Sequence, residues 1–184
     1  SAHLGNGCSI TAIRDGISVD TSMGLTPLEG LVMDTRSGDV DPGLFDFLRS
    51  KGIAADEVHR VLNQESGLLG LSGQTNDMRS LCELADHGHE PSQTAIDVFC
   101  FRLARYVGAM MASLSQLDAL VFTGGIGENS PRIREETIRH LKLTGFELSR
   151  DLNIHHGQFS DGHIESPDSR FPVLVIPTNE ELVI

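Results

Sequence analysis

The sequence is poor in cysteine and has no long hydrophobic run. Its three cysteines, Cys8, Cys82 and Cys100, are scattered and form no Cys-x-x-Cys pair, which argues against a zinc site or a disulfide framework. Scattered thiols fit a reduced, cytoplasmic protein. Neither a signal peptide nor a transmembrane run is visible, so we expect neither secretion nor membrane insertion.

Basic residues are also scarce, since 14 Lys and Arg stand against 26 Asp and Glu and the net charge is −12. Such acidity argues against general binding to nucleic acid or to an anionic membrane. It leaves nucleotide binding open, because a phosphate site needs only local hydrogen-bond donors. With 184 residues and 39% hydrophobic content, the chain can form one domain with a real core.

The apolar pattern of the first half predicts a hairpin followed by helices. Alternation over 8–14 and 17–20 predicts two strands joined by a turn at Asp15-Gly16. Residues 23–42 predict a long structured loop. Helices are expected over 41–48, 55–63, 77–85 and 91–117. The last carries an apolar stripe that we expect in the core: Ile96, Phe99, Leu103, Tyr106, Val107, Met110 and Leu114.

The second half predicts strands separated by one helix. The apolar run 117–122 is typical of a buried parallel strand, and Ser130-Pro131 is a helix start. That helix should continue to Leu141 and stop by Gly145. Residues 153–170 read as a polar surface excursion, and 172–176 as a final buried strand. Helices between apolar strands predict an α/β sheet that is covered on both faces.

Three loops place glycine beside polar side chains, which lets backbone N–H groups approach a phosphate. They lie at 3–7, 34–39 and 124–129. In the first loop, His3 and the Gly5-Asn6-Gly7 turn either contact a phosphate or form a plain hairpin turn. Together the three loops favour a phosphoryl-transfer enzyme.

Arg36 lies in the second loop and is the candidate transition-state residue. A guanidinium matches the charge on the equatorial oxygens of a phosphoryl group in transfer. The alternative is a surface ion pair with Asp34, Asp39 or Asp41.

The stretch 122–130 is the strongest motif, because a strand, a glycine turn and a helix start in that order form an anion or nucleotide site. It lacks the Gly-Lys-Ser/Thr of a Walker loop and differs from the Rossmann fingerprint. A purely structural turn remains the alternative.

Two further segments are candidate contacts. Asp77-Met78-Arg79 suits an adenine or ribose edge, or else Asp77 simply begins a helix. Glu180 follows the last strand, where it could hold Mg²⁺ or face solvent. The pair His155-His156 has no third ligand nearby, so we expect it at the surface.

These motifs, taken in order, resemble the carboxyl-terminal half of the acetate and propionate kinase family. The resemblance rests on 3–7, 19–30, 35–39, 65–70, 122–129 and 176–182, which together span nearly the whole chain. It implies a ribonuclease-H-like α/β domain of the actin-like ATPase, sugar kinase and Hsp70 type. Residues 1–184 would form the carboxyl-terminal nucleotide-binding domain of a two-domain kinase.

The implied reaction is reversible transfer of the ATP γ-phosphate to acetate, with Mg²⁺. The resemblance implies that Arg36 stabilises the transition state and that Glu180 belongs to the metal site. Nucleotide phosphates would contact His3, Leu4, Gly5, Asn6 and Gly7. The adenosine would contact Asp77, Met78, Arg79, Gly125, Ile126, Gly127, Glu128 and Asn129. A cytoplasmic homodimer is also implied.

Several departures from the family pattern affect this expectation. Asp34 stands where the family has glycine, and its carboxylate either weakens the hold of Arg36 on phosphate or points to solvent. The amino-terminal half and the final helix have no counterpart, and the chain starts at Ser1 without methionine. We therefore expect a fragment that carries the nucleotide half of the site. Propionate or butyrate kinase is the nearest alternative, and a non-catalytic nucleotide-binding module is an alternative of another class.

Overall fold

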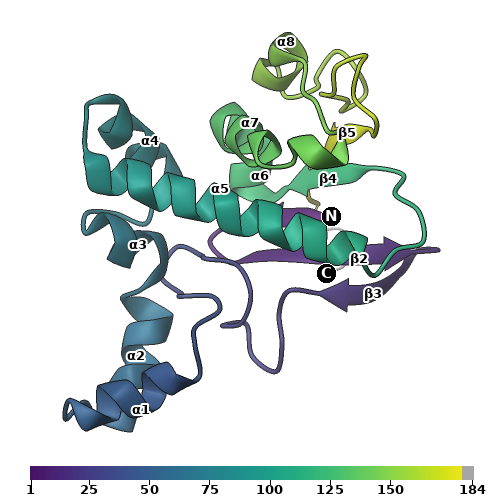
Figure 1. The fold of residues 1–184 in the computed structure, drawn as a ribbon. Coiled ribbons are helices and arrows are strands. Elements are labelled where there is room, and N and C mark those ends of the chain that lie inside the picture. Colours follow the sequence, from purple (N-terminus) through teal and green to yellow (C-terminus); the bar gives the residue numbers. More distant parts are fainter. Residues whose placement is uncertain (180–184) are drawn as a thin grey trace.

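A computed structural model of the chain describes residues 1–179, and a five-stranded sheet forms its centre (Figure 1). The strand order is β3-β2-β1-β4-β5. β1 pairs antiparallel with β2 and parallel with β4, and β4 pairs parallel with β5. The bounds are β1 (Ala2–Leu4), β2 (Cys8–Arg14), β3 (Ile17–Thr21), β4 (Leu120–Thr123) and β5 (Val173–Val175). The predicted α/β fold with a mixed sheet is therefore confirmed.

The β2–β3 hairpin forms as the alternation predicted. Its turn residues Asp15 and Gly16 have φ angles of +54° and +76°, as a type I′ turn requires at both central positions. The β1–β2 connection is a second hairpin, and its loop carries Gly5, Asn6 and Gly7.

Eight α-helices and one short 3-10 helix surround the sheet in the described part of the chain. They are α1 (Gly43–Ser50), α2 (Ala55–Gln64), α3 (Gly67–Ser72), α4 (Met78–Asp86), α5 (Glu90–Met111), α6 (Gly124–Asn129), α7 (Pro131–Arg139), the 3-10 helix Lys142–Thr144 and α8 (Arg150–Ile154). The predicted helix start at Ser130-Pro131 is confirmed, since the Ser130 side chain accepts a hydrogen bond from the amide of Ile133.

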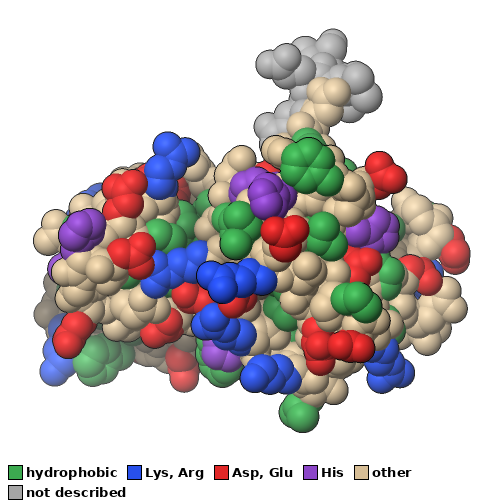
Figure 2. Space-filling model, turned by 90° about the horizontal axis from the view of Figure 1, so that it is seen from above, with side chains coloured by type: hydrophobic (Ala, Val, Ile, Leu, Met, Phe, Trp, Pro, Cys, Tyr) green, Lys and Arg blue, Asp and Glu red, His purple; other side chains and the backbone are tan. Residues whose placement is uncertain are grey.

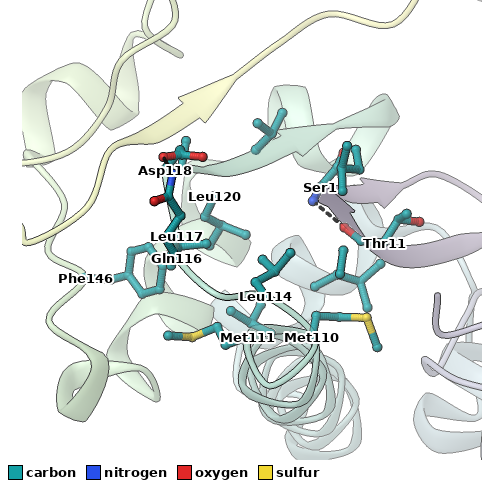
Figure 3. A pocket seen from close by; sticks show the side chains of 16 residues that line it. Ser1, Thr11, Met110, Met111, Leu114, Gln116, Leu117, Asp118, Leu120 and Phe146 are labelled. Carbon is teal, nitrogen blue, oxygen red and sulfur yellow. Dashed lines mark hydrogen bonds between the residues drawn. The ribbon is translucent and has the colours of Figure 1, made fainter. Parts of the chain in front are cut away.

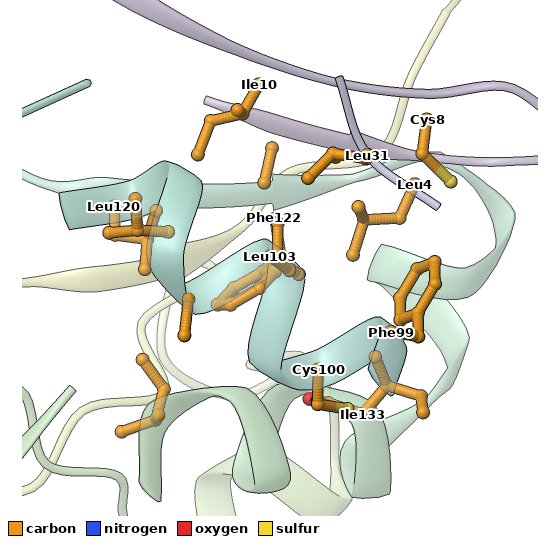
Figure 4. Packing of buried hydrophobic residues seen from close by; sticks show 14 of the residues in the cluster. Leu4, Cys8, Ile10, Leu31, Phe99, Cys100, Leu103, Leu120, Phe122 and Ile133 are labelled. Atoms are coloured by element: carbon orange, nitrogen blue, oxygen red, sulfur yellow. The ribbon is translucent and has the colours of Figure 1, made fainter. Parts of the chain in front are cut away.

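The long helix α5 crosses the sheet and forms the core with it (Figure 4). Phe99 and Leu103 of α5 are almost fully buried, as are Leu4 of β1 and Phe122 of β4. Buried and half-buried residues alternate along β1, β2, β4 and β5, so one face of the sheet supplies the core. The predicted apolar stripe is confirmed as core, with Tyr106 and Leu114 at its half-buried margin. The predicted end of the helix at 117 is wrong, because α5 ends at Met111 and Leu114 lies beyond it.

Three segments differ from the sequence prediction. α3 was not predicted, because a short glycine-containing segment has low helix propensity and depends on tertiary contacts. The glycine loop 124–129 is itself a helix, α6, that starts at the end of β4. The segment 153–170 is not wholly a surface excursion, because Asn153 and Ile164 are buried in it.

Candidate functional site

Three chain segments meet at one edge of the sheet. β1, β4 and β5 run parallel, so the loop after β1, helix α6 after β4 and the residues after β5 all leave the sheet at the same edge. In open α/β sheets this carboxyl edge is where ligands bind. The predicted site residues therefore belong to one region.

The loop after β1 is a tight turn held by two hydrogen bonds. The amide of Gly5 donates to the carbonyl of Gly7 at 3.2 Å, and the Cys8 thiol donates to the carbonyl of Gly5 at 3.2 Å. Burial raises the pKa of Cys8 to about 12, so the thiol stays protonated and remains a donor. His3 is half-buried, and Leu4 is wholly buried in the core.

Arg36 lies directly beside this loop. A Cβ atom built on Gly7 would stand 3.5 Å from Nη1 of Arg36, which is ordinary van der Waals contact, so the guanidinium lies against the turn. The guanidinium donates to the carbonyl of Pro27 at 3.0 Å and to the sulfur of Met33 at 3.5 Å. Both contacts direct the positive charge toward the loop.

The loop that carries Arg36 is fixed by its backbone. The amide of Ser37 donates to Leu62 at 2.9 Å, and the amide of Ser66 donates to Thr35 at 3.0 Å. Among the described residues, the ion pairs considered for Arg36 do not form; Asp39 instead pairs with Arg102 at 3.3 Å. A loop without regular structure is thus held by α2 and the start of α3.

The carboxylate of Asp34 is held at the cleft by two hydrogen bonds rather than lying free in solvent. Its carboxylate accepts from the amide of Thr35 at 2.7 Å and from the side-chain amide of Asn76 at 3.3 Å. Asn76 precedes α4, so the contact joins the loop of Arg36 to the predicted adenosine segment. Asp34 lines the cleft itself.

A cleft of about 720 Å³ lies between α4, α6 and the loop after β1. Its volume is in the range of small-molecule sites. It brings together eight predicted residues: Gly5, Asn6, Asp77, Met78, Arg79, Gly125, Ile126 and Asn129. Six others do not line it: His3, Leu4, Gly7, Arg36, Gly127 and Glu128.

Asp77 begins α4, as one of its two sequence interpretations predicted, and it also lines the cleft. Its carboxylate caps α4 by accepting from the amide of Ser80 at 2.8 Å. Hydrogen bonds from Ser80 lower the pKa of this carboxyl, so it is charged at neutral pH.

Sequence reasoning missed Arg132, which also lines the cleft. Its guanidinium forms ion pairs with Asp86 and Glu136, both at 2.8 Å, and donates to Gln93 at 2.6 Å. These contacts join α4, α5 and α7 behind the cleft. Nothing in the sequence singles out this arginine, because Glu136 is its only near neighbour among these partners, whereas Gln93 and Asp86 lie 39 and 46 residues away.

A buried arginine, Arg134, holds helix α6 through hydrogen bonds to its backbone carbonyls. Arg134 is 0% exposed, and it donates to the carbonyls of Gly127 and Glu128 at 2.7 and 3.0 Å. It also donates to the side chain and carbonyl of Asn153, both at 2.7 Å. Burial lowers the pKa of Arg134 to about 10, which still leaves it charged at neutral pH.

The remaining predicted residues are placed as follows. Glu180 lies outside the described residues. His155 is exposed and stands 3.6 Å from Asp151, whereas His156 contacts Arg134 at 3.2 Å. Within residues 1–179 no group of three or more His, Cys, Asp or Glu side chains is arranged to hold a metal.

A second cavity, of about 220 Å³, lies at the opposite end of the strands (Figure 3). It opens between the end of α5 and strands β2 and β4, and its labelled lining includes Met110, Leu114 and Phe146. It contains no predicted site residue, so the candidate site is the polar cleft.

The surface matches the acidic composition. Figure 2 shows a face on which Lys and Arg side chains gather near the middle, among Asp and Glu. No helix found in the described residues combines the length and apolar character needed to cross a bilayer.

Fold and edge geometry together are those of an α/β domain of the actin-like ATPase class. A sequence profile of the Acetokinase family matches residues 1–184, and the chain belongs to that family. The acetate kinase of Stutzerimonas stutzeri is 55% identical over 181 residues, which are 98% of this chain and 46% of that protein. The acetate kinase of Pseudothermotoga lettingae is 48% identical over 185 residues, covering 100% of this chain and 45% of that protein.

Solved structures of a propionate kinase and an acetate kinase superpose closely on the chain. A propionate kinase from Francisella tularensis superposes with a TM-score of 0.92 at 49% identity, over 98% of this chain and 46% of that one. An acetate kinase from Porphyromonas gingivalis superposes with a TM-score of 0.90 at 41% identity, over 98% of this chain and 45% of that one. The chain thus spans about half the length of the relatives it matches.

Proposed function

We propose that the chain is the nucleotide-binding domain, residues 1–184, of an acetate kinase that transfers the γ-phosphoryl group of ATP reversibly to acetate. One observation carries the proposal: the Arg36 guanidinium lies beside the Gly5-Asn6-Gly7 turn, and Gly5 and Asn6 of that turn line a cleft of about 720 Å³. Backbone amides and a guanidinium stabilise phosphoryl charge, and the cleft is large enough for a nucleoside.

The proposed roles follow the geometry. The turn after β1, with His3 and Leu4 supporting it, holds the phosphates, and Arg36 stabilises the charge on the transferring group. Asp77, Met78 and Arg79 of one wall face Gly125, Ile126 and Asn129 of the other, and the adenosine lies between these walls. Gly127 and Glu128 support the second wall from behind.

Magnesium fits the oxygen-rich lining of this cleft. Asn6, Asn76 and Asp77 supply amide and carboxylate oxygens, the ligands that Mg²⁺ prefers. A Mg²⁺ ion held by these residues would supply positive charge to the phosphates during transfer. Glu180, two residues beyond Thr178, is the proposed protein contribution to the metal site.

The acceptor, the assembly and the compartment are also proposals. Acetate is favoured by the names of the curated relatives, and the propionate kinase likeness supports propionate as the second candidate. A homodimer and a cytoplasmic location follow from family membership. The acceptor pocket is expected in the half of the protein that this chain does not include.

Calorimetric titration of the 184-residue chain with ADP tests the nucleotide site, and a hydroxylamine assay with acetate, propionate and butyrate tests transfer. We expect ADP to bind, and R36A to keep that binding within about fivefold while any transfer falls by about a thousandfold. R139A, which changes an exposed arginine, is the matched control. Failure of the wild-type chain to bind ADP would overturn the proposal. Equal loss of binding and transfer in R36A would indicate a structural role for this arginine.

A further inference from the structure

Helix α6 presents different residues to different neighbours. Gly125, Ile126 and Asn129 line the cleft. A Cβ on Gly127 would lie 3.5 to 3.7 Å from Phe122 and Leu4, so this residue faces the sheet. Glu128 does neither, because its carboxylate turns toward the residues that follow β5.

One oxygen of Glu128 joins two strand ends. Oε1 accepts from the amide of Gly124, at the end of β4, at 2.8 Å. It also accepts from the amide and the hydroxyl of Thr178, at 2.9 and 3.1 Å. Thr178 lies 50 residues away along the chain. The carboxylate therefore links the first turn of α6 to the segment after β5.

The lowered pKa of Glu128 indicates a carboxylate that is charged and hydrogen-bonded. Burial acts to raise the pKa of Glu128, but the hydrogen bonds from Thr178 and Gly124 and the nearby His3 outweigh it, and the pKa is lowered. Hydrogen bonds to an ionised acceptor are among the stronger ones. A contact with a nucleotide hydroxyl would have to compete with all three.

The link lies where the sheet ladder ends. The amide of Ile176 donates to the carbonyl of Phe122 at 3.0 Å, which is the last backbone contact described between these two strands. After this contact the two segments diverge, because β4 leads into α6 whereas β5 leads into Pro177, Thr178 and Asn179. Glu128 is the next contact that holds them together.

We propose that Glu128 is a positioning residue that fixes the Thr178-Asn179 segment against α6, and so sets the metal-side loop relative to the nucleotide-side helix, without touching the nucleotide. This inference rests on the proposed function, in which Glu180, outside the described residues, is the proposed protein contribution to the metal site. It differs from the sequence expectation, which placed Glu128 among the adenosine contacts.

The experiment compares E128A and E128Q with the wild-type chain, with E135Q as the matched control on an exposed face of α7. Hydrogen exchange of the Gly124 and Thr178 amides reports the link itself. Titrations with ADP, with and without Mg²⁺, and with GDP report the site. In E128A we expect both amides to exchange about tenfold faster, as loss of one charged hydrogen bond allows. E128Q, which keeps an acceptor oxygen, should fall between E128A and the wild type.

The ADP and GDP titrations distinguish a positioning role of Glu128 from direct contact with the nucleotide. We expect E128A to bind metal-free ADP within about twofold of wild type and to keep its preference for ADP over GDP, whereas the tightening caused by Mg²⁺ falls about tenfold. Unchanged amide exchange, or a large loss of metal-free ADP binding, would overturn the inference. Faster exchange with unaltered Mg²⁺ tightening would also overturn it. A wild-type chain that binds no ADP is a failure of the proposed function, and the exchange data then still decide whether the link exists.

Discussion

The carboxylate of Asp34 accepts a hydrogen bond from the side-chain amide of Asn76 at 3.3 Å, across a separation of 42 residues. Both residues line the cleft, and their contact links the loop of Arg36 to the segment just before α4. The carboxylate is therefore fixed inside the proposed nucleotide site. Its charge faces the space that phosphates would enter.

Replacing this carboxylate should tighten nucleotide binding. D34N keeps an oxygen that can accept from the amide of Thr35, but it removes a negative charge beside the phosphates. We expect the dissociation constant for ADP to fall roughly threefold to tenfold, and the gain to shrink with added salt. Calorimetry at two salt concentrations measures this, with N76D as the opposite change. Weaker binding in D34N would mean that Asp34 is a ligand of the nucleotide or its metal.

Gly67 should be intolerant of any side chain. Its φ angle is +59°, and a Cβ there would meet the carbonyl of Met33 and lie 2.7 Å from the carbonyl of Arg36. We expect G67A to lower the free energy of unfolding by roughly 2–4 kcal/mol. Gly73 has a φ of +65° but open space around it, so G73A should cost only about 1 kcal/mol. Urea denaturation of both variants gives the comparison, and equal costs would contradict the crowding argument.

Loss of Arg134 should destabilise the whole chain. R134M leaves the carbonyls of Gly127, Glu128 and Asn153 buried without their donor. We expect a loss of about 3 kcal/mol or more in the free energy of unfolding. R139A, at a side chain that is 62% exposed, should change it by less than about 0.5 kcal/mol. Chemical denaturation measures both, and similar stabilities would show that the buried guanidinium is dispensable.

Stability should fall as the solution becomes mildly acidic. Burial, and then the Arg134 guanidinium, lower the pKa of His156 from its ordinary value of 6.5. The unfolded chain then binds the proton more readily, so the contribution of His156 is fully present above pH 6.5 and is lost progressively as pH falls toward the folded-state pKa.

H156N tests this dependence, because asparagine tolerates the left-handed backbone of His156, whose φ is +54°. The slope of unfolding free energy against pH should be shallower in H156N just below pH 6.5. H59N, at an exposed histidine, is the control. Carboxyls with lowered pKa values, such as Glu165, act only below 4.5 and lie outside this window. A slope identical to wild type would contradict the prediction.

The sequence predicted most elements whose signal is local. Alternation identified β2 and β3, the apolar stripe identified α5, and the Ser130-Pro131 pair identified the start of α7. The carboxyl edge of the parallel strands also followed from the order of the elements.

Features that depend on distant partners were not predictable in the same way. α3 forms where the amides of Leu68 and Leu69 donate to the carbonyls of Met33 and Asp34, and no local pattern carries that information. The direction of a polar side chain depends on the same distant contacts. Asp34 turns to Asn76, and Glu128 turns to Thr178, because these partners, 42 and 50 residues away, donate hydrogen bonds to their carboxylates.

The backbone hydrogen bonds of the Arg36 loop determine which partial unfolding would remove Arg36 from the site. Ser37 is tied to Leu62, and Thr35 to Ser66, so the loop takes its shape from α2 and α3 rather than from the sheet. A partial opening of residues 55–72 would withdraw Arg36 while the central strands stay folded. The proposed transfer activity would then be lost on warming before the central strands unfold, at a temperature set by the α2–α3 unit.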